Sequence, residues 1–102
     1  PIVVNYGGPG EIVTNDTGFR LPIGQRDLIV EKARALLARI AKREFDLSML
    51  AANGLRRVCE LYTWQKKAAQ LNEVYDWVCG DLPKRPHFPF LDAAPTTSVE
   101  PG

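Results

Sequence analysis

The chain has 102 residues, of which 45% are hydrophobic and 25% are charged, an ordinary composition for a globular protein of at most one domain. It carries 13 Lys and Arg residues against 12 Asp and Glu residues, and this net charge of +1 predicts no strong attraction to nucleic acid or to an anionic membrane. No apolar run approaches the roughly 20 residues that a membrane-spanning helix requires.

The first part of the chain combines a strand signal with a glycine-rich loop. The β-branched run IVV at residues 2–4 predicts a short strand, and the Gly-Gly pair at positions 7 and 8 predicts a loop directly after it. Pro9 suits the first position of a helix, where its missing N–H is not needed. We therefore expect one helical turn over residues 9–13, with Glu11 in its first turn.

A polar turn and a second strand follow. Residues 14–18 have turn chemistry, with Gly18 free to adopt a positive φ, and the strand alternates through Phe19, Leu21 and Ile23. Two parallel strands do not make a self-sufficient sheet, because parallel sheets contain more strands and are covered on both faces. The missing initial Met and the uncapped opening strand favour a processed or truncated piece that begins in the middle of a domain.

Beyond Gln25 the pattern becomes helical. A first helix is predicted by apolar residues recurring on one face, with Lys32 and Arg39 on other faces: Ile29, Ala33, Leu36, Leu37 and Ile40. Asp46 is a good N-cap for a second helix, whose stripe comprises Ala51, Leu55, Val58, Cys59 and Tyr62. Gly54 within this helix costs about 1 kcal/mol relative to Ala, which indicates close packing or a local break.

A third helix and a proline-rich segment complete the chain. Thr63 is the expected N-cap, and one face of the helix carries Trp64, Ala68, Leu71, Tyr75 and Val78. Gly80 is a suitable residue to follow the helix, and Pro83 prevents its continuation. We expect residues 83–102 to form a Pro-rich extended tail.

Several residue types invite a functional interpretation beside a structural one. Cys59 and Cys79 are expected to be small core residues of a reducing compartment, since partners for a disulfide or a metal site are lacking. His87 lies in the tail with no Cys or acidic cluster beside it, so no catalytic role is expected. Core packing is favoured over carbohydrate stacking for four aromatic residues: Tyr62, Trp64, Tyr75 and Trp77. A solvated helix face is favoured over a basic patch for Arg56, Arg57, Lys66 and Lys67.

An ordered set of motifs resembles one enzyme family over about residues 1–80. The pieces are VVNYGGPGEIV, TNDTGFRLPI, a long amphipathic helix, ANGLRRVCELYTW and AAQLNEVYDW. This order resembles the C-terminal end of retaining, nucleotide-sugar-dependent glycosyltransferases of family 4, which have the two-domain GT-B fold. The TWQ and VYDW segments are most similar to the sucrose synthase and sucrose-phosphate synthase branch.

The resemblance implies an α/β fold: the C-terminal half of a Rossmann-like donor domain, helix-dominated, with two short parallel strands and three main helices. Residues 1–82 would be the distal part of the domain that binds the nucleotide diphosphate sugar. The implied donor-binding residues are Gly7, Gly8, Pro9 and Glu11. Their position after a strand suits a ligand site of an open α/β sheet, and N–H groups at the start of a helical turn favour phosphate. A purely structural turn at these residues remains the alternative.

The resemblance also implies what this chain lacks. The family's pair of glutamates, its basic residues for the leaving diphosphate and its entire acceptor domain would precede Pro1. The parent enzyme would transfer a sugar to a hydroxyl acceptor with retention, without a metal or cofactor carried by this segment, and the isolated chain is expected to be inactive. The N-terminus shows no signal-peptide pattern, so we expect a cytoplasmic location, with peripheral membrane association of the parent as an alternative.

A second hypothesis is a non-catalytic helical interaction module. An unpaired strand edge at Ile2–Val4 and three amphipathic helices could bind a partner or a second copy of the chain. A nucleic-acid binder is disfavoured because the overall charge is nearly neutral.

Overall fold

The structure is a computed structural model that describes residues 1–91. Its two strands, β1 (Ile2–Val4) and β2 (Phe19–Leu21), pair in parallel with Ile2 opposite Phe19 and Val4 opposite Leu21. Both predicted strands are confirmed, although β2 ends before Ile23. The reason is local, because Pro22 follows directly and has no N–H to donate to a ladder.

The helix after β1 begins earlier than the sequence predicts. Helix α1 spans Gly7–Ile12, so Pro9 is its third residue rather than its first. Pro is accepted there because the first-turn N–H groups have no partner within the helix. The expectation that Glu11 lies in the first turn is wrong, since that turn contains no acidic residue. Gly7 adopts a φ of 57°, and this left-handed conformation lets the chain enter α1 directly from the strand.

The three long helices are α2 (Arg26–Ala41), α3 (Leu47–Leu61) and α4 (Trp64–Cys79). Both predicted caps are confirmed: the Asp46 side chain accepts a hydrogen bond from the Met49 N–H at 2.9 Å, and the Thr63 hydroxyl accepts one from the Lys66 N–H at 3.2 Å. Helix α3 continues through Gly54 without a break. A Cβ at Gly54 would meet the carbonyl oxygen of Thr17 at 3.8 Å, so this glycine is close to the turn before β2.

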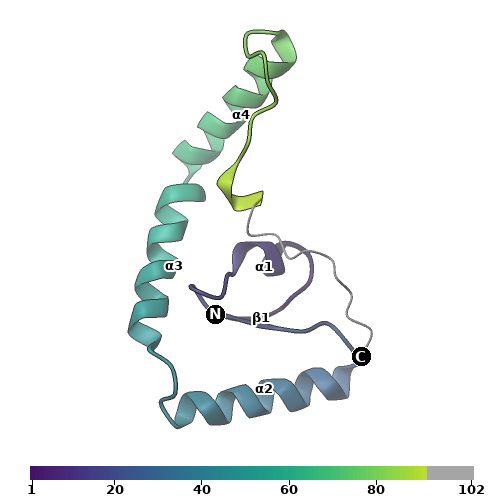
Figure 1. Cartoon of the computed structure of the whole chain (residues 1–102), viewed down its shortest axis with the longest axis vertical. Helices are drawn as coiled ribbons and strands as arrows, with labels where there is room; N and C mark the ends of the chain where they lie inside the picture. Colours follow the sequence, from purple (N-terminus) through teal and green to yellow (C-terminus); the bar gives the residue numbers. More distant parts are fainter. Residues whose placement is uncertain (92–102) are drawn as a thin grey trace.

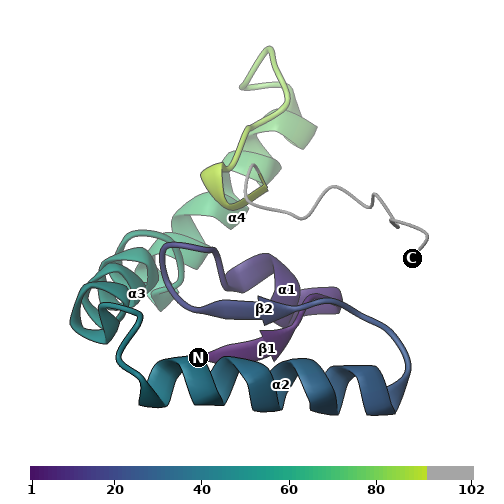
Figure 2. The same ribbon diagram turned by 60° about the horizontal axis from the view of Figure 1, so that its bottom comes forward.

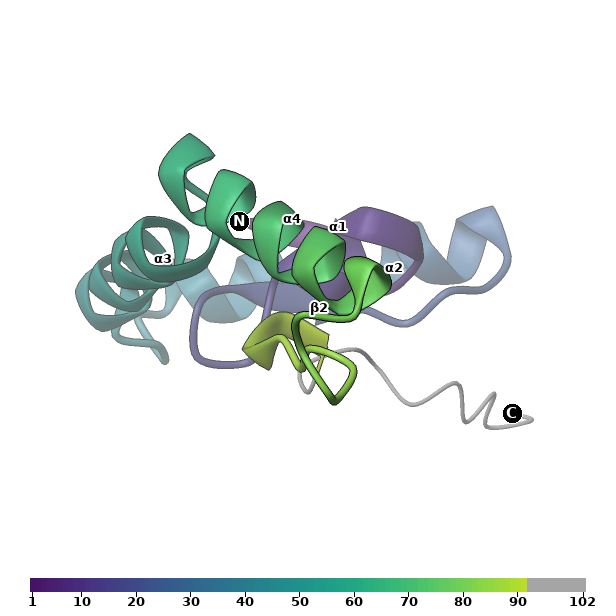
Figure 3. The same ribbon diagram turned by 90° about the horizontal axis from the view of Figure 1, so that it is seen from above.

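After α4 the chain reverses direction, as Figures 1 and 3 show. Gly80 ends the helix with a φ of 90°, as predicted, and the chain returns to a short 3₁₀ helix, η1 (Pro89–Leu91), which contacts α1. Phe88 and Phe90 stack with ring centroids 5.6 Å apart, and both are half-buried. The remainder of the predicted tail, residues 92–102, lies outside the described residues.

Two of the basic residues assigned to a solvated helix face are instead packed against aromatic rings. The Lys67 Nζ lies 4.7 Å from the ring centroid of Tyr62 and 4.3 Å from that of Phe90. The Arg57 guanidinium lies 5.7 Å from the same Tyr62 ring. Cation–π contacts of this kind join α3, α4 and the returning segment. Arg56 and Lys66 are exposed, as expected.

The strands lie between two helices, with α1 on one side and α2 on the other (Figures 1 and 2). The buried apolar residues of the described chain are Leu21, at the end of β2, and Val13, which follows α1 directly. The radius of gyration is 17.2 Å, whereas a compact domain of this length has about 13 Å. Helices α3 and α4 account for the difference, since they extend away from the strands as an arm (Figure 1).

This open shape overturns the predicted core roles of several residues. Trp64 is 88% exposed and Tyr75 is 58% exposed, and both cysteines are exposed as well. The stripes of α3 and α4 are real, because apolar residues do recur on one face of each helix. Within residues 1–91, however, the contacts with α1 and with the returning segment cover these faces only in part, and neither helix has a buried residue. The observed fold is thus a helix-dominated α/β arrangement with two short parallel strands.

Candidate functional site

The predicted donor-binding residues form one helical turn at the carboxyl end of β1. All four of them, Gly7, Gly8, Pro9 and Glu11, belong to α1 and are exposed to solvent. Apart from the adjoining residues and the backbone of α1 itself, no atom of residues 1–91 lies within 4 Å of the position that a Cβ would occupy at Gly7 or Gly8. The backbone at this turn is therefore open to close approach by a ligand, and it lies where open parallel sheets bind theirs.

The strand ends hold this turn in place. The Asn5 N–H donates to the carbonyl oxygen of Leu21 at 2.7 Å, which extends the ladder beyond β1. Gly10 is buried against Asn5, and a Cβ there would lie 3.0 Å from the Asn5 carbonyl carbon. Within residues 1–91, the buried Asn5 Oδ1 has no hydrogen-bond partner. Gly10 is thus glycine for lack of space and Gly7 for its positive φ, whereas neither constraint applies to Gly8, which leaves space above the backbone.

The other end of α1 is anchored to the arm. The Arg57 Nε donates to the carbonyl oxygen of Ile12 at 3.0 Å, which places a cation at the carboxyl end of the short helix. A cation is favourable at this end because the last carbonyl groups carry partial negative charge. The same guanidinium donates to the Tyr62 hydroxyl at 3.4 Å. Arg57 therefore couples the orientation of α1 to that of α3.

The turn before β2 is fixed by a threonine pair. The Thr17 hydroxyl, buried with its residue 7% exposed, accepts a hydrogen bond from the Thr14 N–H at 2.9 Å. The carbonyl oxygen of Thr14 accepts bonds from the N–H groups of Thr17 and Gly18, each at 3.1 Å. A buried, fully bonded hydroxyl of this kind specifies one conformation of the turn. It therefore determines where β2 starts relative to β1.

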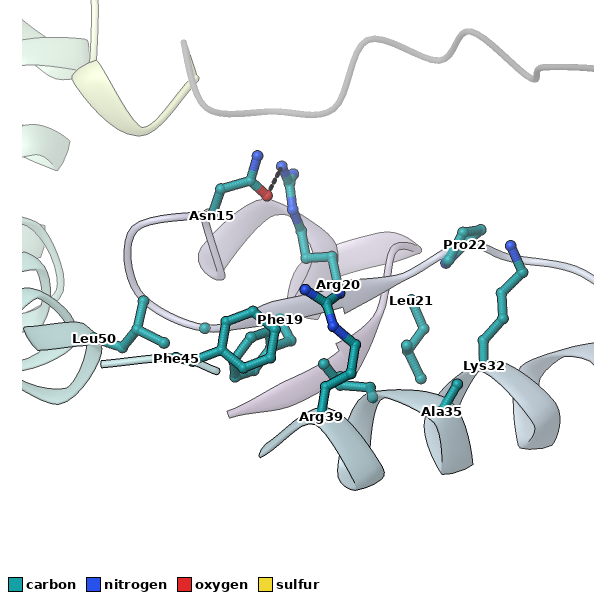
Figure 4. A pocket seen from close by; sticks show the side chains of 12 residues that line it. Asn15, Phe19, Arg20, Leu21, Pro22, Lys32, Ala35, Arg39, Phe45 and Leu50 are labelled. Atoms are coloured by element: carbon teal, nitrogen blue, oxygen red, sulfur yellow. Dashed lines mark hydrogen bonds between the residues drawn. The ribbon is translucent and has the colours of Figure 1, made fainter. Parts of the chain in front are cut away.

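A groove along β2 was not anticipated from the sequence. It has a volume of about 460 Å³ and runs between β2, α2 and the segment that joins α2 to α3 (Figure 4). Its cationic lining residues are Arg20, Lys32 and Arg39, and no Asp or Glu of residues 1–91 lines it. Lys32 and Arg39 are seven residues apart on α2, hence on one face of that helix. Both residues lie off the apolar stripe, as predicted, and their spacing was the available signal that they share a face.

The cations of the groove differ in how far they are already paired. Arg39 forms an ion pair with Glu44, with 2.6 Å between Nε and Oε2, and lies 4.7 Å from the ring centroid of Phe45. Within residues 1–91, the Arg20 side chain donates to a neutral group, the Asn15 side-chain oxygen, at 3.2 Å. Among the described residues, neither Arg20 nor Lys32 has an ion pair with a carboxylate. The groove is therefore a positively charged surface with incomplete compensation.

A second, apolar groove of about 300 Å³ separates α1 from α3. Apolar side chains line it from the end of α1, among them Ile12 and the C-cap Val13, and from α3, among them Leu50, Leu55 and Val58. Leu55 is 68% exposed, so this face of α3 has room for a further apolar element.

The described residues contain no cluster of three or more His, Cys, Asp or Glu side chains that could hold a metal ion. In the same part of the chain, none of the helices has the length and apolar character needed to cross a membrane. Comparison of the chain with models of protein families, with curated proteins and with solved structures found no match.

Proposed function

We propose that this chain is the distal part of the donor domain of a retaining glycosyltransferase with the GT-B fold. The parent enzyme would transfer a sugar from a nucleotide diphosphate sugar to a hydroxyl acceptor. The observation that carries the proposal is the parallel β1–α1–β2 unit, in which the GGPGE motif forms the turn at the carboxyl end of β1. The sequence motifs that resemble this family occur in the family's order along the same elements.

The chemistry explains why the isolated chain would be inactive. A departing nucleotide diphosphate needs positioned cations or N–H donors, and the acceptor hydroxyl must be held beside the sugar. Residues 7–11 can offer backbone N–H groups at the turn, and Glu11 is the only charged side chain among them. The turn would thus form one wall of a donor site whose cationic groups lie on other segments.

A titration of the 102-residue chain with a nucleoside diphosphate sugar, followed through backbone amide shifts, tests direct donor contact. We expect the largest shifts at residues 7–11. The matched variants are Gly8→Val and Gly54→Ala. Because a Cβ at position 8 would meet no neighbouring residue, valine there should block a ligand without clashing with the rest of the protein. Gly8→Val should abolish the shifts and Gly54→Ala should retain them, whereas shifts confined to other residues would remove donor contact from the proposal.

The family assignment has a test that does not depend on binding by this piece. Sequencing the gene upstream of the Pro1 codon should reveal an in-frame pair of glutamates separated by the family's spacing. A start codon directly before Pro1 would refute a donor-domain origin.

The second candidate function is a non-catalytic interaction module. The exposed apolar faces of α3 and α4 favour it, since Leu55, Trp64 and Val78 are each at least two-thirds exposed, at 68%, 88% and 71%. Large apolar patches on a protein surface commonly mark sites of association. Sedimentation velocity over a wide concentration range separates the two functions: concentration-dependent association supports the module, and a monomer throughout counts against it.

A further inference from the structure

The outer edge of β2 has unpaired backbone groups that lie along the basic groove. The Phe19 N–H donates to the Pro1 carbonyl at 2.9 Å, and the Leu21 carbonyl accepts from Asn5 at 2.7 Å, so these two residues direct their backbone groups toward β1. In a parallel ladder the residue between them directs its N–H and carbonyl the opposite way. Arg20 therefore presents one donor and one acceptor to the groove side, where no strand of the described chain pairs with it.

We propose that this edge binds an extended acidic peptide segment of a partner protein, which adds a third strand beside β2. An unpaired edge is a template for strand addition, in which backbone hydrogen bonds supply affinity and side-chain pockets supply specificity. Such a peptide is the occupant whose backbone would satisfy both outward-facing groups of Arg20. A compact anion would leave at least one of them without a partner.

The charge of the groove determines the chemistry of the peptide. Arg20 and Lys32 lie on its two sides, one on β2 and the other on α2, and neither is paired with a carboxylate among the described residues (Figure 4). Carboxylates on a strand between them would compensate both charges. A basic peptide would be repelled by the same two cations, so the groove favours acidic over basic peptides.

The floor of the groove suits the alternation of a strand. Phe19 and Phe45 pack edge to face with centroids 4.8 Å apart, and Leu36 and Leu50 also line the groove. Since successive side chains of a strand point to opposite faces, a bound segment can direct apolar residues toward this floor and acidic residues toward Arg20. The Lys32 side chain extends from α2 to the level of Pro22 (Figure 4), where an acidic residue at the end of the same segment can reach it. The preferred ligand is thus a segment that alternates acidic and β-branched residues.

The test uses the whole chain and a short fluorescent peptide of alternating Glu and Val, with binding measured by anisotropy. Two control peptides are compared with it. The first is a Lys-Val peptide of opposite charge. The second is a Glu-Val peptide N-methylated at alternate residues, which keeps the negative charge but lacks the backbone N–H groups for strand hydrogen bonds. We expect N-methylation to weaken binding roughly 2- to 10-fold for each hydrogen bond lost. The Lys-Val peptide should not bind.

Protein variants test the same groove from the other side. Lys32→Glu, within the groove, and Arg34→Glu, on the same helix but outside the lining residues, make the same change in net charge. Removal of an exposed ion pair weakens binding by about two- to fivefold, so Lys32→Glu should have at least this effect and Arg34→Glu none. Hydrogen exchange at the Arg20 amide should slow when the Glu-Val peptide is bound.

Three results would overturn the proposal. These are equal binding of the N-methylated peptide, equal weakening by the two charge reversals, and unchanged exchange at the Arg20 amide. Tighter binding of a single-stranded oligonucleotide than of the Glu-Val peptide would also overturn the proposal, because it would show that the groove binds polyanions in general. The groove does not include residues 7–11, so these outcomes leave the donor-site titration unaffected.

Discussion

Gly18 lies at the closest backbone approach in the strand pair, and replacing it with alanine tests whether that approach positions β2. An alanine Cβ would lie 2.6 Å from the Pro1 carbonyl oxygen and 2.9 Å from the Pro1 Cδ, whereas ordinary contact begins at 3.4 Å. The atom that must move is the carbonyl oxygen that accepts the Phe19 N–H at 2.9 Å. The substitution therefore disturbs the first rung of the ladder.

The expected cost follows from two contributions. Overpacking against backbone atoms costs about 1–3 kcal/mol, and a weakened hydrogen bond adds about 1 kcal/mol. Alanine also restricts the unfolded chain, which stabilises the protein by about 0.4–1 kcal/mol. The net expectation is a destabilisation of about 1–3 kcal/mol. With Val13 and Leu21 as the buried apolar residues of the described chain, such a loss is a large part of the local stability.

Gly54→Ala is the matched control, because it changes the unfolded chain in the same way. Its Cβ would make an ordinary contact at 3.8 Å with the Thr17 carbonyl oxygen, and alanine is better than glycine inside a helix by about 1 kcal/mol. The two substitutions should therefore change stability in opposite directions, although both convert glycine to alanine.

Amide hydrogen exchange at Asn5 and Phe19 measures the opening of the strand pair directly. Gly18→Ala should reduce protection at these amides by about 5- to 150-fold, the equivalent of 1–3 kcal/mol. Gly54→Ala should leave it unchanged or raise it. Undiminished protection in Gly18→Ala would refute the inference that the contact between Pro1 and Gly18 determines how the strands pair.

Three further predictions concern the helices. Asp46→Ala should destabilise α3 by about 1 kcal/mol because the cap on the Met49 N–H is lost; an unchanged thermal transition in circular dichroism would contradict this. Arg43 adopts a φ of 57°, which costs a residue with a side chain about 1–2 kcal/mol, so Arg43→Gly should raise the midpoint of urea unfolding. Cys59 and Cys79 are exposed, so a thiol reagent should modify both in the native chain at the rate of an unprotected thiol; a thiol that reacts only in denaturant would show burial instead.

The elements themselves were largely predictable, because local chemistry dictates them. Asp46 and Thr63 cap the helices that their side chains predict, and Gly80 ends α4 in the conformation that glycine allows. Pro22 explains why β2 ends where it does, although the apolar alternation continues to Ile23. The start of α1 was less predictable, since Gly7 and Gly8 are poor helix formers and enter the helix only through the geometry of the turn.

The sites depended on contacts that no local pattern reveals. The turn over residues 7–11 was identified from the sequence, but its openness at Gly8 and its closed packing at Gly10 depend on where Asn5 lies. The basic groove combines Arg20 from a strand with Lys32 and Arg39 from a helix. Periodicity alone placed those two helical residues off the apolar face of the helix, because it records which face is apolar and not which element lies beside the other faces.

The sequence by itself determined the order and type of the main elements, since capping, proline geometry and periodicity act within a few residues. Only the tertiary structure decided which apolar faces are buried. The stripes of α2, α3 and α4 look equivalent in the sequence, yet α2 packs against β2 and half-buries Ile29, Leu36 and Ile40, whereas Trp64, Tyr75 and Leu55 on the other two helices are exposed. Burial depends on what lies opposite a face, and in the described chain the strand pair is too small to cover more than α1 and α2.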